Sequence, residues 1–308
     1  MQLGIARRGL INMWRPSVGI RTCVGALALA GAVAATAAPL ASANEPLPVP
    51  SGFFSGIALE ATNPGGSDPG TNDFSCTPSA AHPDPVVLVH GTAANRQTNW
   101  GVLAPVLANE GYCVFALTFG NRTDQPWPIS AAGGLAPLGD SAGQLSDFVD
   151  DVLSATGASK VDLIGHSQGT TVSAYYAKFL GGDAKVSKIV SIAPLWDGSE
   201  VGPPEGVGGP DFDNATFVTE LRDAGVYSDD VEYTNIVTRF DQVVVPYSSG
   251  ILAASNASNI VVQDGCEQDL SDHIALVASQ RTATLTLNAL DPSNPREVPC
   301  TRVLPIFG

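Results

Sequence analysis

The stretch from residue 161 to residue 171 constrains this chain most, because a short apolar run leads directly into a Gly-x-Ser-x-Gly turn. Apolar and aromatic residues then recur at helical spacing: Val172, Tyr175, Tyr176, Phe179 and Leu180. This order predicts a strand, a sharp turn that exposes the Ser167 hydroxyl, and a helix. Gly165 and Gly169 lack a Cβ, which lets the strand and helix approach closely. We therefore predict that Ser167 is a nucleophile and that the Gln168 amide, which opens the helix, donates to an oxyanion.

A serine hydroxyl needs a base to take its proton, and the four histidines differ in their positions relative to Ser167. His82 and His90 precede the serine, and His166 is its immediate neighbour, where adjacent side chains diverge. Only His273 follows it, in a polar loop that leads into an apolar helical run. Triads built on this serine motif run Ser, then Asp or Glu, then His along the chain, so His273 is the predicted base.

The acid of such a triad lies between the serine and the histidine, ideally just after a strand. Residues 232–238 alternate as a β-strand does, and Asp241 follows them closely. Asp241 is therefore the predicted acid that orients the imidazole. Two alternatives stay open, namely Asp264, after the strand expected at 259–263, and Asp272, beside the histidine.

Four segments together resemble the secreted bacterial lipases and esterases of lipase class 2: residues 87–92 (Val-Leu-Val-His-Gly-Thr), 165–169 (Gly-His-Ser-Gln-Gly), 239–247 (Arg-Phe-Asp-Gln-Val-Val-Val-Pro-Tyr) and 272–273 (Asp-His). The resemblance runs from about Pro85 to the end of the chain. It implies an α/β-hydrolase, similar to triacylglycerol lipases, that cleaves carboxylic esters through Ser167, Asp241 and His273 without a cofactor or metal. The relatives often carry a further cysteine pair in the segment that begins after residue 195, the expected cap, and this chain has none in that segment, so the lid region and the acyl-chain preference stay open.

The apolar run from Pro85 to Val89 has the length of a strand buried on both faces, and His90-Gly91-Thr92 ends it. In an α/β-hydrolase this loop supplies the second oxyanion amide, which we assign to Thr92, with Ala93 as the alternative. His90 is expected to brace the loop rather than to act as a base.

Strand and helix patterns alternate along the chain, which predicts a mostly parallel sheet with helices on both faces. Strands are expected at 85–89, 112–117, before the turn at Ser167, and at 188–193, 232–238 and 259–263. Helices are expected at 100–111, after a capping box at 141–144, after the serine, and at 274–290. A small cap insertion, mostly loop with one helical turn, is expected at about 195–230, and residues 120–139 form either a pocket wall or a surface loop.

Residues 1–43 have the features of a signal peptide. They contain four arginines, an apolar run of small residues from 24 to 38 and Ala-Ser-Ala at 41–43. The run is short for a membrane-spanning helix, so we expect cleavage near Ala43 and Asn44, secretion, and no stable membrane anchor. Residues 44–84 follow as a Pro- and Gly-rich extension on the surface, and residues 85–308 form the hydrolase domain.

The mature chain is strongly acidic and carries four cysteines. Without the four arginines of the first 43 residues, 11 Lys and Arg remain against 30 Asp and Glu, a formal net charge of −19. Such a chain repels nucleic acid, and we expect a soluble monomer. An even cysteine count in an exported chain predicts two disulfides, and no Cys-x-x-Cys spacing favours a zinc site. Of three possible connectivities we favour the nearest pairings, Cys76 with Cys113 and Cys266 with Cys300.

The residues therefore predict a secreted serine hydrolase whose substrate is an ester or lipid. Three alternatives remain: transfer of the acyl group to a cell-envelope acceptor, cleavage of peptides, and a non-catalytic secreted binding protein on the same scaffold. The complete set of Ser167, Asp241 and His273 argues against the last of these.

Overall fold

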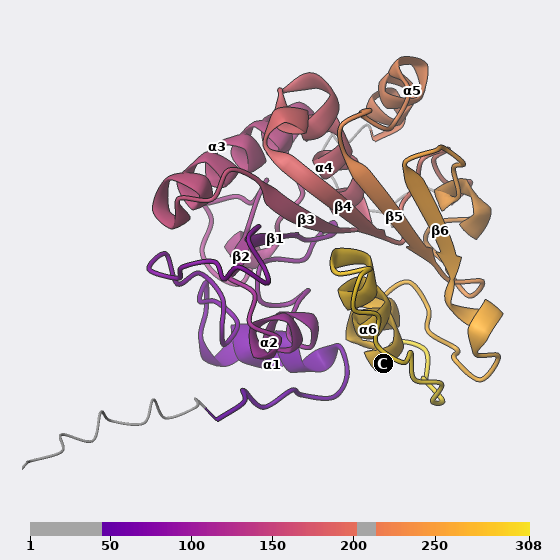
Figure 1. The fold of residues 1–308 in the computed structure, drawn as a ribbon, viewed down its shortest axis with the longest axis horizontal. Helices are drawn as coiled ribbons and strands as arrows, with labels where there is room; N and C mark the ends of the chain where they lie inside the picture. Colours follow the sequence, from indigo (N-terminus) through magenta and orange to yellow (C-terminus); the bar gives the residue numbers. More distant parts are fainter. Residues whose placement is uncertain (1–44, 202–213) are drawn as a thin grey trace, which may run out of the picture. The chain divides into compact units, whose positions relative to one another are not determined.

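A parallel sheet of six strands organises the chain (Figure 1). The computed structural model describes residues 45–201 and 214–308, so the expected signal peptide and the middle of the cap insertion lie outside the described residues. Neighbouring strands follow the order β2-β1-β3-β4-β5-β6, and every pair is parallel. The strands are β1 (Val86–Val89), β2 (Val114–Leu117), β3 (Val161–His166), β4 (Val186–Ile192), β5 (Glu232–Val237) and β6 (Ala257–Val261). The expected parallel sheet is thus confirmed.

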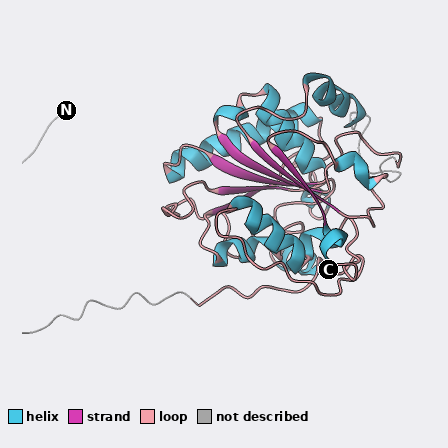
Figure 2. Ribbon diagram, turned by 45° about the vertical axis from the view of Figure 1, so that its right-hand side comes forward, coloured by secondary structure: helices cyan, strands magenta, loops and turns pink. Residues whose placement is uncertain are grey.

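Helices cover both faces of the sheet (Figure 2). They are α1 (Phe54–Thr62), α2 (Leu103–Asn109), α3 (Leu138–Thr156), α4 (Gln168–Phe179), α5 (Asn214–Ala224) and α6 (Gln280–Leu290). Short 3-10 helices add η1 (Ile129–Ala131), η2 (Gly182–Ala184), η3 (Tyr247–Gly250), η4 (Val262–Gly265) and η5 (Ala275–Ala278). Within the described residues, no helix is long and apolar enough to cross a membrane.

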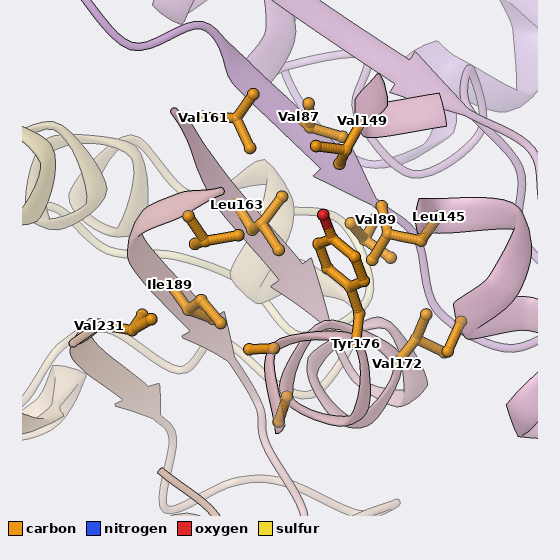
Figure 3. Close-up of a cluster of buried hydrophobic side chains, with 14 of the residues drawn as sticks. Val87, Val89, Leu145, Val149, Val161, Leu163, Val172, Tyr176, Ile189 and Val231 are labelled. Carbon is orange, nitrogen blue, oxygen red and sulfur yellow. The ribbon is translucent and has the colours of Figure 1, made fainter. Parts of the chain in front are cut away.

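Two apolar cores, one on each face, explain the unbroken apolar runs of the central strands. Val87 and Val89 point into the core shared with α3 and α4, whereas Val86 and Leu88 point into the core shared with α2 and α6. Figure 3 shows the first core, where Tyr176 of α4 lies among side chains of the sheet and of α3. Each such aliphatic side chain contributes about 1.5–3 kcal/mol when it is fully buried.

Several helix boundaries differ from the predictions. The capping box at 141–144 was a wrong prediction, because α3 begins at Leu138 and Ser141 is buried inside it. The end of α3 is as predicted, since Gly157 adopts the left-handed conformation with φ 70°. The closing helix is divided, because the Ser279 side chain accepts from the Thr282 amide and starts α6 anew after η5. In the cap, α5 has 11 residues where a single helical turn was predicted.

The N-terminal extension is more ordered than its composition predicted. It contains the nine-residue helix α1, and it covers the edge strand β2. Asn72 donates its amide N–H to the Val114 carbonyl at 2.9 Å, and its side chain bonds both the N–H and the C=O of Ala116. These bonds satisfy backbone groups that an exposed edge strand would leave open.

Asp68 of this extension gives a stability prediction. The residue is 2 % exposed, and neither carboxylate oxygen has a hydrogen-bond partner within the described residues. Burial raises the pKa of Asp68 to about 8, against about 3.9 in an unfolded chain. The contribution of this group to stability is therefore complete below about pH 4 and is lost as the pH rises through 8. We expect Asp68→Asn to raise Tm relative to the wild type at pH 9 but not at pH 4, as thermal unfolding at both values will measure.

An exposed aspartate on α3 supplies the control for this experiment. Asp151→Asn should change Tm by a small and similar amount at both pH values, since its carboxylate stays in water. Equal Tm differences for Asp68→Asn at pH 4 and pH 9 would contradict the prediction.

Candidate active site

Ser167 lies at a strained turn between β3 and α4. Its backbone has φ 52° and ψ −124°, a conformation that costs a non-glycine residue about 1–3 kcal/mol. Its amide donates to the carbonyl of Ile192, at the end of β4, at 2.9 Å. The two flanking glycines are required by close approach, because a Cβ on Gly169 would lie 2.0 Å from the Val89 carbonyl oxygen. A Cβ on Gly165 would lie 2.8 Å from Gly169. The turn therefore has the geometry of a nucleophile elbow.

The structure brings Asp241 and His273 together across 32 residues of sequence. Nδ1 of His273 lies 2.9 Å from Oδ2 of Asp241, and both side chains are buried, with 6 % and 3 % exposed. The other carboxylate oxygen of Asp241 accepts from the amides of Val243 at 2.9 Å and Val244 at 2.7 Å. These two amides fix the carboxylate, which leaves Oδ2 for the imidazole.

The two alternative acids make other contacts. Asp264 pairs with Arg239 at the surface, and 61 % of its side chain is exposed. Asp272 accepts from the Ala275 amide at 2.8 Å and from the Gln242 side chain at 3.1 Å. Neither carboxylate contacts the His273 ring in these pairings, so the geometry favours Asp241.

The His273 ring also lies close to the elbow. Its centroid is 5.0 Å from that of His166, the residue directly before Ser167. Nε2 of His166 lies 3.1 Å from the carbonyl oxygen of His273. The third segment, the loop after β1, meets the same turn, because a Cβ on Gly91 would lie 3.2 Å from the Cβ of Ser167.

In the loop after β1, the hydrogen bonds of the backbone amides favour Thr92 over Ala93 as the oxyanion donor. The amide of Ala93 donates to the Gly133 carbonyl at 2.9 Å, and the Gly133 amide donates back to the Ala94 carbonyl at 2.8 Å. The Thr92 amide donates to no protein acceptor in the part of the chain that the structure describes. Gln168, whose amide is the other predicted donor, stands as the first residue of α4.

His90 braces the loop, as the sequence predicted. Its Nδ1 lies 2.8 Å from the Gly91 carbonyl, its Nε2 accepts from the Phe119 amide at 3.2 Å, and its ring stacks on that of Phe119. Complete burial lowers the pKa of His90 to about 4. The ring is therefore neutral and fully engaged, which does not suit a general base.

Buried polar residues that the sequence did not reveal hold the oxyanion loop in place. Glu60 of α1 accepts from Gln97 at 2.7 Å and from the Trp127 indole at 3.2 Å. Asn95 donates to the Ala131 carbonyl at 2.9 Å. The segment around Trp127, predicted as either a pocket wall or a surface loop, therefore packs against the loop that carries Thr92.

Comparison with known proteins agrees with this fold. The family described as alpha/beta hydrolase fold matches residues 84–229. Aspergillus fumigatus lipase B superimposes with a TM-score of 0.58 at 21% identity, covering 76% of this chain and 57% of that one. The mature Bacillus licheniformis lipase BlEst2 gives 0.52 at 14% identity, covering 69% and 94%. The chain has the α/β-hydrolase fold.

Two curated relatives of this chain are triacylglycerol lipases, from Pseudarthrobacter phenanthrenivorans and Burkholderia plantarii. Each is 36% identical over 98 residues, which cover 30% of this chain and 28% or 25% of the relative. The matched segment thus spans only about a quarter of the length of those lipases. Over that segment, the chain is similar to triacylglycerol lipases.

The segment before the undescribed part of the cap packs on the loop that holds Asp241. The amide of Glu200 donates to the Val245 carbonyl at 2.7 Å, and the Ser199 hydroxyl donates to the Val243 carbonyl at 2.6 Å. Apolar side chains are exposed here: Val201, Phe240 and Val243. Exposed apolar side chains therefore lie in the two segments that meet beside Asp241.

Both predicted disulfides are present, and they link different parts of the chain. Cys76–Cys113 joins the extension to the start of β2, and Cys266–Cys300 joins the C-terminal tail to the loop before His273. In the tail, the Val303 carbonyl also accepts a hydrogen bond from the Leu270 amide at 3.2 Å. The second disulfide therefore holds the loop that carries His273.

The two disulfides close loops of similar size, so the variants that lack one or the other should be similarly destabilised. Their activities should differ, because only the second disulfide holds the loop of His273. Their sequence separations of 37 and 34 residues correspond to about 4 kcal/mol each from loop closure. At a temperature where both variants are folded, Cys266→Ser/Cys300→Ser should lose about 10-fold in kcat, because the predicted base, His273, would be displaced. Steady-state kinetics and thermal unfolding measure the two effects.

The other disulfide is the matched control for this comparison. Cys76→Ser/Cys113→Ser should lower Tm by a similar amount while kcat per folded molecule stays near that of the wild type. Equal losses of kcat in both variants would show that the position of the bond has no bearing on His273.

Proposed function

We propose that this α/β-hydrolase is a secreted serine hydrolase that cleaves carboxylic esters, with Ser167 as nucleophile, His273 as base and Asp241 as the acid that orients it. The observation that carries the proposal is the buried 2.9 Å contact of His273 with Asp241, beside a strained turn with Ser167 at its tip. Similarity to triacylglycerol lipases over 98 residues supports an acyl ester as substrate. The exposed apolar side chains beside Asp241 fit an apolar acyl chain.

The reaction begins with proton transfer between Ser167 and His273. Because Nδ1 of His273 donates to Asp241, Nε2 is the nitrogen that can accept the serine proton. The serine oxygen forms a bond to the ester carbonyl carbon, and the carbonyl π electrons move to oxygen, giving an oxyanion. The amides of Thr92 and Gln168 are its proposed donors, and in comparable enzymes loss of one such donor costs about 3 kcal/mol in the barrier.

Collapse of this intermediate releases the alcohol. The carbon–oxygen bond to the alkoxy group breaks, and His273 gives its proton to the leaving oxygen. The acyl group now forms an ester with Ser167, and His273 removes a proton from water as it attacks that ester. The carboxylic acid leaves and the serine regains its proton, so each turnover consumes one ester and one water.

Hydrolysis of p-nitrophenyl butyrate and palmitate by the mature chain from Asn44 tests the proposal, with butyryl p-nitroanilide as the matched amide. We expect the esters to be cleaved much faster than the amide, and stoichiometric inactivation by a p-nitrophenyl phosphonate with the label on Ser167. Added alcohol or sugar tests for acyl transfer, since the partition of product reveals an acceptor other than water. A chain that cleaves no ester and takes up no label would contradict the proposal and favour a binding protein.

A further inference from the structure

His166 occupies a position that the proposed chemistry gives no role. Its side chain is buried, with only 5 % of the residue exposed, although it is the immediate neighbour of Ser167. Its ring contacts two other segments of the site. These are the loop after β1 and the loop that carries His273.

One ring nitrogen of His166 reaches the oxyanion loop through Asn99. Nδ1 lies 3.0 Å from the Asn99 side-chain oxygen, and the same oxygen accepts from the Gly91 amide at 3.1 Å. Gly91 directly precedes Thr92, the proposed oxyanion donor. A Cβ on Gly91 would lie 3.1 Å from Nδ1 of His166, so the loop and the ring are in close contact.

The other ring nitrogen reaches the base itself. Nε2 of His166 lies 3.1 Å from the carbonyl oxygen of His273, and the two rings are tilted by 40° with centroids 5.0 Å apart. The backbone of His166 continues into the elbow. A single rigid side chain thus touches all three segments that have to be placed relative to one another.

We propose that His166 is a positioning residue that sets the distance of the oxyanion loop and of His273 from Ser167, through Asn99 and the His273 carbonyl. The inference rests on the proposed function. Catalysis depends on such placement, because a displacement of about 1 Å can cost about 100-fold in rate.

The charge state of the ring suits this role. Burial, followed by the nearby His273, lowers the pKa of His166 to about 3. The ring therefore stays neutral while His273 gains and loses its proton, and it adds no like charge that would disfavour the His273 imidazolium. A neutral imidazole has one N–H, so it donates through one nitrogen only.

Three substitutions separate the two contacts of His166. Leu removes both, Asn keeps a donor near the position of Nδ1, and Gln keeps one near that of Nε2. We expect His166→Leu to lower kcat per phosphonate-titrated site about 100-fold with KM within about threefold, and the one variant, Asn or Gln, that restores the single N–H donor of the ring to recover about 10-fold. His82→Leu is the control, because His82 stacks on Tyr112 away from these loops and should leave kcat unchanged.

Hydrogen exchange gives a readout that does not depend on ester hydrolysis. In His166→Leu, amides of residues 91–99 and 270–276 should exchange faster than in the wild type, while those of α3 stay unchanged. Wild-type kcat per titrated site together with unchanged exchange would overturn the inference, whereas an inert wild type would overturn the proposed function alone. If the Leu variant does not fold, wild-type kcat in both the Asn and Gln variants would overturn the inference instead.

Discussion

Ser167→Ala should lower kcat for p-nitrophenyl butyrate by about 10⁶-fold, the loss seen when the nucleophile of a comparable triad is removed. The remaining groups have no oxygen to attack the ester, so only slow hydrolysis by water assisted by the oxyanion donors is left. The fold should persist, because alanine has a Cβ in the same place and the turn is held by the Ile192 carbonyl and the two close glycines. Steady-state kinetics and Tm measure the two expectations together.

A second serine controls for the substitution itself. Ser154 lies exposed on α3, and Ser154→Ala should retain wild-type kcat and phosphonate labelling. A Ser167→Ala protein that is folded and still cleaves the ester at more than about one thousandth of the wild-type rate would assign the chemistry to another nucleophile.

The features predicted correctly from the sequence are those that local pattern or chain order decides. The turn at Ser167 is encoded within five residues, and the helix after it within twelve. The continuous apolar run of β1 indicated burial on both faces, which the two cores explain. Both disulfides follow from pairing the nearest cysteines, since each closes a loop of fewer than 40 residues.

Contacts between distant segments escaped prediction, because no local pattern records them. The bond from Glu60 to Gln97 spans 37 residues, and that from His166 to Asn99 spans 67. Composition alone also did not reveal the helix in the Pro- and Gly-rich extension, where α1 packs its Gly56 against the carbonyls of Gln97 and Thr98. Tertiary packing decides such elements, and it outweighs their weak intrinsic propensity.

Asp241→Asn should lower kcat by about 10⁴-fold, because it stabilises the wrong tautomer of His273. In the wild type, Oδ1 of Asp241 accepts from the amides of Val243 and Val244, and Oδ2 faces Nδ1 of His273. An asparagine keeps its single oxygen on those two amides and turns its NH₂ group towards Nδ1. The imidazole then carries its proton on Nε2, the nitrogen that has to accept the proton of Ser167.

The same substitution at the two other candidate acids makes this prediction specific. Asp264→Asn removes a surface ion pair with Arg239 and should leave kcat within about twofold, because exposed pairs contribute little. Asp272→Asn keeps a side-chain oxygen that can accept from the Ala275 amide, so it should change stability by less than about 1 kcal/mol, with a far smaller loss of kcat than Asp241→Asn. A reversal, with the large loss at Asp272, would move the acid to the residue beside His273. Asp241 would then only hold its own loop, through the bonds of its Oδ1 to the Val243 and Val244 amides, and Asp272 would set the tautomer of His273.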